Sequence, residues 1–181
     1  MIHKAIQFAT VCHQNQTRKG TDIPYIMHCL EAGVIASSLT NEAGVIDEEV
    51  VAAAILHDTM EDAFVTYETL VELFNERVAT LVQSQSEDKS KTWKERKEAT
   101  IQFLKQNESR AVEIATLSDK LSNMRAIAKE YAVRGEVVWE KFNAGKQEQK
   151  WYYTSLGQAF HYVTDTKEYA EYIALVRETF Q

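Results

Sequence analysis

The chain has 181 residues, of which 45% are hydrophobic and 26% are charged, and this balance excludes a disordered or fibrous protein. The length allows one domain with a sizeable core, and a second independent domain is not expected. The formal net charge of −7 excludes non-specific binding to nucleic acid or to an anionic membrane, because such surfaces repel an acidic protein.

Few residues in the chain interrupt helices. A single proline and six glycines favour an all-α fold over a turn-rich sheet protein. No apolar run is long enough to span a membrane, and the first residues do not resemble an export signal. Cys12 and Cys29 form no CxxC pair and are expected to be core thiols. We therefore expect a cytoplasmic, all-α, single domain over residues 1–181.

The first helix is predicted from about Ile2 to Gln14, because apolar residues recur there at spacings of three and four. A polar loop follows over residues 15–22, rich in turn formers. Pro24 fits the first turn of a second helix that continues to about Leu39, and His28 lies near its start.

A third helix is predicted from Glu48 to about Met60, with Asp47 as its N-cap. Residues 50–56 are apolar on every face, which is typical of a helix at the centre of a bundle. This buried run leads directly into His57-Asp58-Thr59-Met60-Glu61-Asp62. Polar and ionisable groups delivered by such a helix are costly unless they have partners.

The remaining elements follow the same periodicity and capping signals. Thr66 is a plausible cap for a helix over about 67–84, and Ser109 for a long helix to about Tyr131. Asp119 and Asn123 share one face of that long helix, because they are four residues apart. The other helices are expected at about 93–105, 136–142 and 147–181, the last of these divided near Asp165 and preceded by a break around Gly145.

His28, His57, Asp58 and Asp119 form the candidate metal site. Two imidazoles and two carboxylates without a thiolate suit manganese, iron, zinc or magnesium, and would not select copper(I) or an iron–sulfur centre. The alternative interpretation assigns each residue a structural role, with the His-Asp pair as a helix end and Asp119 as a hydrogen-bonded core carboxylate. The joint occurrence of all four at helical spacing favours the metal.

Glu61 and Asp62 are the candidates for catalytic acid–base chemistry. They follow His57 and Asp58 by four residues each, so they face the same side if the helix continues. A carboxylate that is not a ligand can accept a proton from water activated beside a metal ion. The alternative is a solvated helix terminus.

Cationic residues gather at Arg18-Lys19 and between Lys89 and Lys97. They are interpreted either as ordinary solubilising charges or as groups that clamp phosphate. The aromatic residues nearby, Tyr25, Trp93 and 151–153, are expected to be core or rim residues rather than base-stacking platforms.

Taken together, these motifs resemble the hydrolase domain of the RelA/SpoT family in its stand-alone form, the small alarmone hydrolases related to the metazoan SpoT homologue. The matches run in order along most of the chain. They are the helix end at Ala9 to His13, Arg18-Lys19-Gly20, Pro24 to His28, Ala53 to Asp62, Glu95-Arg96-Lys97, and Leu117 to Arg125. The resemblance implies an HD-domain helical bundle.

The resemblance also implies residue roles. It implies a manganese ion held by His28, His57, Asp58 and Asp119, with Glu61 and Asp62 handling the nucleophilic water. The reaction of the family removes pyrophosphate from the 3′ position of guanosine tetra- or pentaphosphate, by attack of an activated water on phosphorus. The substrate contacts carried over are Arg18, Lys19, Lys94 or Lys97, Asn123 and, as a looser match, Tyr152.

Three departures from the family pattern affect the pocket and leave the ligands in place. Cys29 stands where proline commonly follows the first metal histidine, and Ser122 stands where the last motif often has histidine. The stretch 83–89 differs from the glycine-valine-threonine-lysine form of long bifunctional members. No synthetase domain follows residue 181, so we expect hydrolysis of the alarmone without its synthesis.

Three hypotheses therefore remain open. The first is a manganese-dependent 3′-pyrophosphohydrolase that acts on a small nucleotide such as guanosine tetraphosphate. The second is a phosphohydrolase of another nucleotide or phosphorylated metabolite, which would release orthophosphate. The third is a metal-bearing nucleotide sensor with little turnover, against which the Glu61-Asp62 pair speaks, because a binding module needs no water-activating carboxylates.

Overall fold

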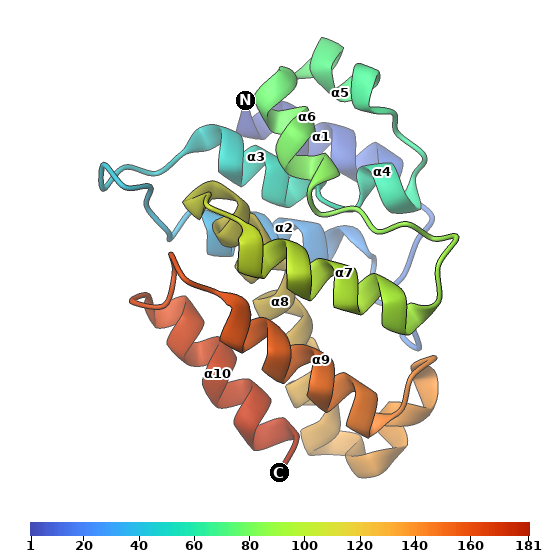
Figure 1. Ribbon diagram of the computed structural model, residues 1–181. Helices are drawn as coiled ribbons and strands as arrows, with labels where there is room; N and C mark the ends of the chain where they lie inside the picture. Colours follow the sequence, from blue (N-terminus) through green and yellow to red (C-terminus); the bar gives the residue numbers. More distant parts are fainter. The chain divides into compact units, whose positions relative to one another are not determined.

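The computed structural model describes residues 1–181 and contains helices and no strand, which confirms the all-α expectation (Figure 1). One isolated antiparallel bridge joins Thr17 to Pro24. No helix is both long and apolar enough to cross a membrane. The helices are α1 (Ile2–Cys12), α2 (Ile26–Ala36), α3 (Glu48–Leu56), α4 (Thr59–Asp62), α5 (Tyr67–Leu73), α6 (Glu76–Gln83), α7 (Trp93–Gln106), α8 (Arg110–Arg134), α9 (Lys146–Ala159) and α10 (Lys167–Thr179), with a 3₁₀ helix at Gly135–Lys141.

The chain divides into two compact units. The first unit contains residues 1–86 and 110–119, and the second contains residues 87–109 and 120–181. The long helix α8 therefore contributes its first part to one unit and its remainder to the other. The single domain expected over residues 1–181 stays a prediction.

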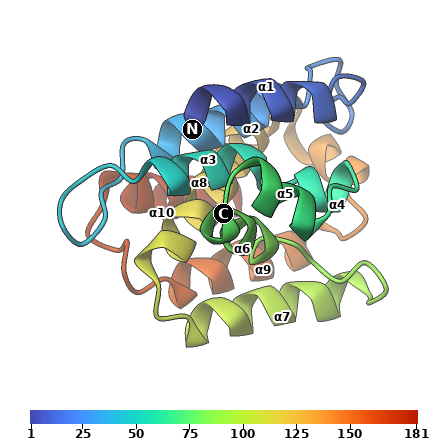
Figure 2. The ribbon, with the colours of Figure 1, turned by 90° about the horizontal axis from the view of Figure 1, so that it is seen from above.

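Helix α3 is the centre of the first unit. Every residue from Val50 to Leu56 is buried, as its uniformly apolar sequence predicts, and α1, α2 and α6 contact it. Both ribbon views place α1 and α2 beside α3 (Figures 1 and 2). Gly33 lets α2 approach closely, because a Cβ at this position would lie 2.4 Å from Cγ1 of Ile55. This contact brings the helix that carries His28 close to α3, whose C-cap is His57.

Two of the helices expected from the sequence are interrupted in the structure. The helix predicted to reach Met60 ends at Leu56, and α4 begins only at Thr59. The Thr59 hydroxyl donates to the Leu56 carbonyl at 2.7 Å, which occupies a helix-end acceptor at the break. The helix predicted over 67–84 is divided because Asn75 adopts an extended conformation and its side chain accepts from the Val78 N–H, capping α6.

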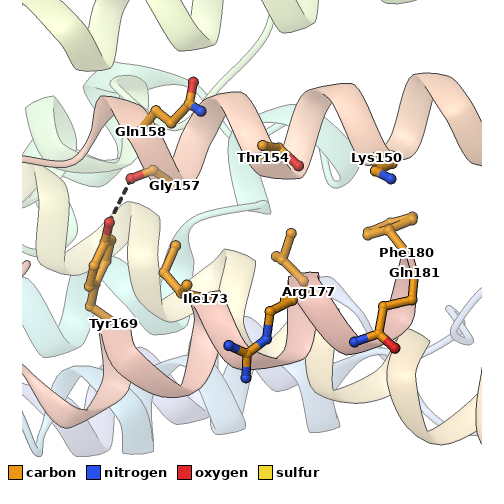
Figure 3. Close-up of a pocket in the computed structure, with 10 residues that line it drawn as sticks. Lys150, Thr154, Gly157, Gln158, Tyr169, Ile173, Arg177, Phe180 and Gln181 are labelled. Carbon is orange, nitrogen blue, oxygen red and sulfur yellow. Dashed lines mark hydrogen bonds between the residues drawn. The ribbon is translucent and has the colours of Figure 1, made fainter.

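The second unit is built around α7, α9 and α10. Thr92 and Glu95 form a capping box at the start of α7, which fixes where this helix begins. Along the α9–α10 interface lies a groove of about 450 Å³, shown in Figure 3, where the Tyr169 hydroxyl donates to the Gly157 carbonyl at 2.9 Å. The groove carries Lys150 and Arg177, and no carboxylate, thiol or imidazole side chain lines it. It therefore lacks the imidazole, thiolate and carboxylate ligands typical of transition-metal sites.

Phe64 is a strained residue immediately after α4. Its φ of +57° lies in the left-handed region, and its side chain is 89% exposed, so little burial compensates the strain. We expect Phe64→Gly to stabilise the protein by about 1 kcal/mol, measured by urea unfolding, because glycine adopts this conformation without a Cβ clash. Phe103→Gly is the matched control, since a glycine inside α7 should destabilise by a similar amount. An equal loss of stability in both variants would contradict the assignment of strain.

Candidate metal and phosphohydrolase site

Four side chains converge in the first unit from separate helices. His28 lies on α2, His57 is the C-cap of α3, Asp58 is the N-cap of α4, and Asp119 lies on α8. The buried run of α3 places His57 in the interior, where its side chain is 1% exposed. Its Nδ1 bonds to the Ala54 carbonyl at 2.8 Å, which leaves Nε2 to face the other three residues.

The polar atoms of these residues lie within a few ångströms of one another. Nε2 of His57 is 3.1 Å from Nε2 of His28 and 2.7 Å from Oδ2 of Asp58. Oδ1 of Asp119 is 3.2 Å from His28 Nε2 and 3.6 Å from His57 Nε2. The sequence had placed these four together as candidate ligands, and the structure brings all of them into one cluster.

The carboxylates of the cluster stabilise a positive charge beside them. Burial opposes protonation of His57, but the negative charges of Asp58 and Asp119 outweigh it and raise its pKa to about 9. Burial also tends to raise the pKa of Asp58, yet the charge of His57 and its hydrogen bond hold that pKa far below the usual range. Burial lowers the pKa of His28. Two carboxylates thus favour a positive charge beside them in the interior, and a divalent cation would supply one.

The donor set fits a divalent metal. The donor atoms of His28, His57 and Asp119 lie within 4.8 Å of one another, and so do those of Cys29, His57 and Asp58. Burial, followed by the charges of Asp58 and Asp119, raises the pKa of the Cys29 thiol, which disfavours the thiolate form that binds metal ions. The imidazole and carboxylate donors that remain suit manganese, iron or zinc.

Glu61 and Asp62 follow Asp58 on the single turn of α4, and both are half-buried. The helix was expected to continue through His57, but α4 is a separate turn that begins after Asp58. The Asp62 N–H still donates to the Asp58 carbonyl at 2.8 Å, so a backbone hydrogen bond joins Asp62 to the candidate ligand Asp58. Their catalytic roles stay a prediction.

A family model described as HD domain matches residues 5–148. This span includes all four clustered residues and both carboxylates of α4. The chain belongs to the HD-domain family.

The relatives of this HD domain support the resemblance to RelA/SpoT-type hydrolases. The guanosine-3′,5′-bis(diphosphate) 3′-pyrophosphohydrolase MESH1 of Danio rerio is 36% identical over 126 residues, which is 69% of this chain and 68% of the relative. The guanosine-3′,5′-bis(diphosphate) 3′-pyrophosphohydrolase of Aquifex aeolicus is 35% identical over 70% of this chain, but this match covers only 18% of that longer protein.

Two solved structures resemble the fold of this chain. A structure described as a metazoan orthologue of SpoT that hydrolyses ppGpp superposes with a TM-score of 0.79 and 26% identity, covering 98% of this chain and 94% of the other. A protein of Listeria monocytogenes EGD-e superposes with a TM-score of 0.75 and 30% identity, covering 84% of this chain and 98% of the other. The expected HD-domain bundle is therefore confirmed.

The cationic residues expected to bind substrate are distributed over both units of the HD domain. In the first unit the Arg18 guanidinium lies 5.7 Å from the ring centre of Tyr25, and Lys19 is exposed. Lys94, Lys97, Asn123 and Tyr152 belong to the second unit. Their contribution to one substrate site stays a prediction.

In the second unit, Lys97 is surrounded by charged and aromatic groups. Its Nζ bonds to Glu87 at 2.7 Å and lies 4.9 Å from the ring centre of Tyr152. Burial, followed by the neighbouring charge of Lys120, lowers the pKa of Lys97. Lys94 is exposed and lies 3.9 Å from Glu98, and Asn123 is half-buried on α8. Lys97 is therefore the more constrained of the two candidate lysines.

Sequence reasoning missed Tyr25 as a site residue. It was expected to be a core or rim aromatic, but its hydroxyl donates to Asp58 Oδ2 at 2.6 Å. Burial and the charge of Asp58 raise the pKa of Tyr25, so it remains a phenol donor. Its place three residues before His28 was the available signal, because residues at that spacing lie close together.

Proposed function

We propose that this chain is a metal-dependent phosphohydrolase that removes pyrophosphate from the 3′ position of guanosine tetra- or pentaphosphate. The observation that carries the proposal is the buried convergence of His28, His57, Asp58 and Asp119, with Glu61 and Asp62 on the adjoining turn. The names of relatives that are 35% and 36% identical support this substrate class. Manganese as the ion and the cytoplasm as the location are parts of the same proposal.

The four clustered residues would hold the ion through two imidazole nitrogens and two carboxylates. When bound, a divalent ion at this position would polarise a phosphoryl oxygen and lower the pKa of a water molecule. The Nδ1 bond of His57 to Ala54 and the Tyr25 bond to Asp58 fix the orientation of these two ligands.

Glu61 and Asp62 act on the water in the proposed reaction. One of the two carboxylates accepts a proton from water as the water oxygen bonds to phosphorus, and the other holds that water in line with the bond from phosphorus to the ribose 3′ oxygen. That bond breaks, and the 3′ oxygen leaves as a hydroxyl after taking up a proton from solvent. Half-burial suits this work, since a carboxylate shielded from bulk solvent is held in one place yet remains within reach of a water molecule.

Binding of a polyanion requires locally gathered cations, because the chain as a whole carries a net charge of −7. Arg18 and Lys19 are proposed to supply two such charges in the first unit, and Lys94 or Lys97, which belongs to the second unit, is a candidate by resemblance to the family. The Arg18 guanidinium can bind two phosphate oxygens at once, which a lysine cannot do in the same fixed geometry. Asn123 and Tyr152 are proposed to contact the nucleoside.

A single assay tests the proposed function. Manganese-loaded protein is incubated with a panel of guanosine nucleotides, and the products are identified by mass. Release of pyrophosphate from the 3′ position supports the proposal, whereas release of orthophosphate favours another phosphorylated metabolite as substrate. Tight nucleotide binding with no cleavage over hours would favour a sensor. Parallel samples loaded with magnesium, zinc or iron test the choice of manganese.

Arg18→Ala should mainly weaken substrate binding. We expect the Michaelis constant to rise about tenfold or more, since a charge-assisted contact contributes about 1.5–3 kcal/mol, while kcat changes less. Arg177→Ala is the matched control, because that arginine lines the α9–α10 groove and has no proposed role in substrate binding. An unchanged Michaelis constant in the Arg18 variant would count against its contact with phosphate.

A further inference from the structure

Gln16 and Tyr25 close the neck of the loop between α1 and α2. The Tyr25 N–H donates to the Gln16 carbonyl at 2.8 Å, and the bridge between Thr17 and Pro24 lies just inside this bond. The loop beyond the neck carries Arg18, a proposed phosphate contact. The two neck residues are therefore tied to each other and to the base of this loop.

The side chains of these neck residues reach opposite ends of α4. Gln16 Nε2 donates to the backbone carbonyl of Asp62 at 2.9 Å, at the last residue of the turn. The Tyr25 hydroxyl donates to Asp58 Oδ2 at 2.6 Å, at the N-cap. The neck of this loop thus contacts the N-cap of α4, Asp58, and its last residue, Asp62, on either side of Glu61.

His13 fixes the orientation of the neck. Its Nδ1 bonds to Oε1 of Gln16 at 2.7 Å, which leaves the Gln16 amide nitrogen to donate to Asp62. The His13 ring is 1% exposed and lies 5.2 Å, centre to centre, from the ring of Tyr25. A buried imidazole that contacts both neck residues restricts the motion of their side chains.

We propose that Gln16 and Tyr25 are positioning residues that set the geometry of α4, and that His13 orients this pair. The inference rests on the proposed function, because it concerns the placement of Asp58 and of the Glu61-Asp62 pair for that reaction. A helix of four residues cannot hold its own geometry, since its nucleation is unfavourable and few internal bonds oppose that cost. The neck supplies the external contacts that a longer helix would not need.

The two residues act through different partners, and their effects should therefore separate. Tyr25 acts through a proposed metal ligand, so Tyr25→Phe should lower manganese affinity by about 10- to 100-fold. Gln16 acts through Asp62, which is not a proposed ligand, so Gln16→Met should leave manganese affinity unchanged. It should lower kcat by about tenfold or more through misplacement of the carboxylates, with little change in the Michaelis constant.

The experiment compares each variant of the full chain with a matched control. Gln14→Met changes an exposed glutamine near the same helix end, and Tyr67→Phe removes a hydroxyl that contacts Thr80 on α6. Manganese affinity is measured by calorimetry, and kcat and the Michaelis constant are measured with guanosine tetraphosphate. Amide hydrogen exchange is followed at Asp62 and Val65, whose N–H groups donate to Asp58 and Thr59.

Faster exchange at Asp62 and Val65 in both neck variants, with the expected separation of manganese affinity from kcat, supports the proposal. The proposal is overturned if amide exchange equals that of the control variants, or if the only kinetic change is a higher Michaelis constant. If the unmodified protein releases no pyrophosphate, the proposed function fails, and exchange together with manganese affinity still decides whether the neck positions α4. If one neck variant does not fold, the other decides the outcome by the same measurements.

Discussion

Replacing His57 with alanine should remove divalent-ion binding and abolish turnover. His57 is the most enclosed member of the cluster, and its Nε2 lies within 3.6 Å of polar atoms of His28, Asp58 and Asp119. Changes in residues that only support a ligand cost about 10- to 100-fold in metal affinity, so loss of a ligand should cost more than about 100-fold. Asp58→Asn should have the same effect, because it removes the charge that pairs with His57.

Manganese retention after dialysis, measured by atomic emission, checks this prediction. His3→Ala is the matched control, since His3 is exposed on α1 and belongs to no proposed site. Circular dichroism establishes that the His57 variant remains helical. A folded His57→Ala protein that retains one equivalent of manganese would remove this residue from the ligand set.

Glu61→Gln should keep the metal and lose most of the turnover. Glutamine preserves the size of the side chain but cannot accept a proton from water, and general base catalysis typically contributes about 10²- to 10⁴-fold. We therefore expect kcat to decrease by a factor within that range, while manganese retention stays unchanged. Asp62→Asn, measured in parallel, identifies which of the two carboxylates is the base. The variant in which the base is replaced should show the larger loss of kcat.

Glu72→Gln is the control for this pair, since Glu72 is exposed on α5 and has no proposed role. Full activity in the Glu61 variant would remove Glu61 from the mechanism. Equal and complete activity in both the Glu61 and Asp62 variants would mean that neither carboxylate handles the water.

Much of the fold could be predicted from local patterns. The predicted caps Asp47 and Thr66 precede α3 and α5, and the break expected around Gly145 precedes α9. Apolar periodicity also identified α3 as a buried helix. The breaks at His57-Asp58 and at Asn75 were not predicted, because periodicity continues across an interruption of one or two residues when both flanking helices bury the same side.

The candidate site was predictable where side chains carry unusual chemistry. The sequence indicated His28, His57, Asp58 and Asp119, and these residues lie together. It did not indicate Gln16 or Tyr25, because a glutamine in a polar loop and a tyrosine at a helix start have many ordinary roles. Contacts such as Gln16 to the Asp62 carbonyl depend on tertiary packing and leave no periodic signal.

The route by which α8 joins the first unit has a consequence for synthesis of the protein. Asp119 is separated from His28 by the five helices α3 to α7, and residues 87–109, which include α7, belong to the other unit. A ribosome must therefore add residue 119 of 181 before the fourth side chain of the cluster exists. Until then His28, His57 and Asp58 lack their last partner, and contacts between such distant residues form slowly.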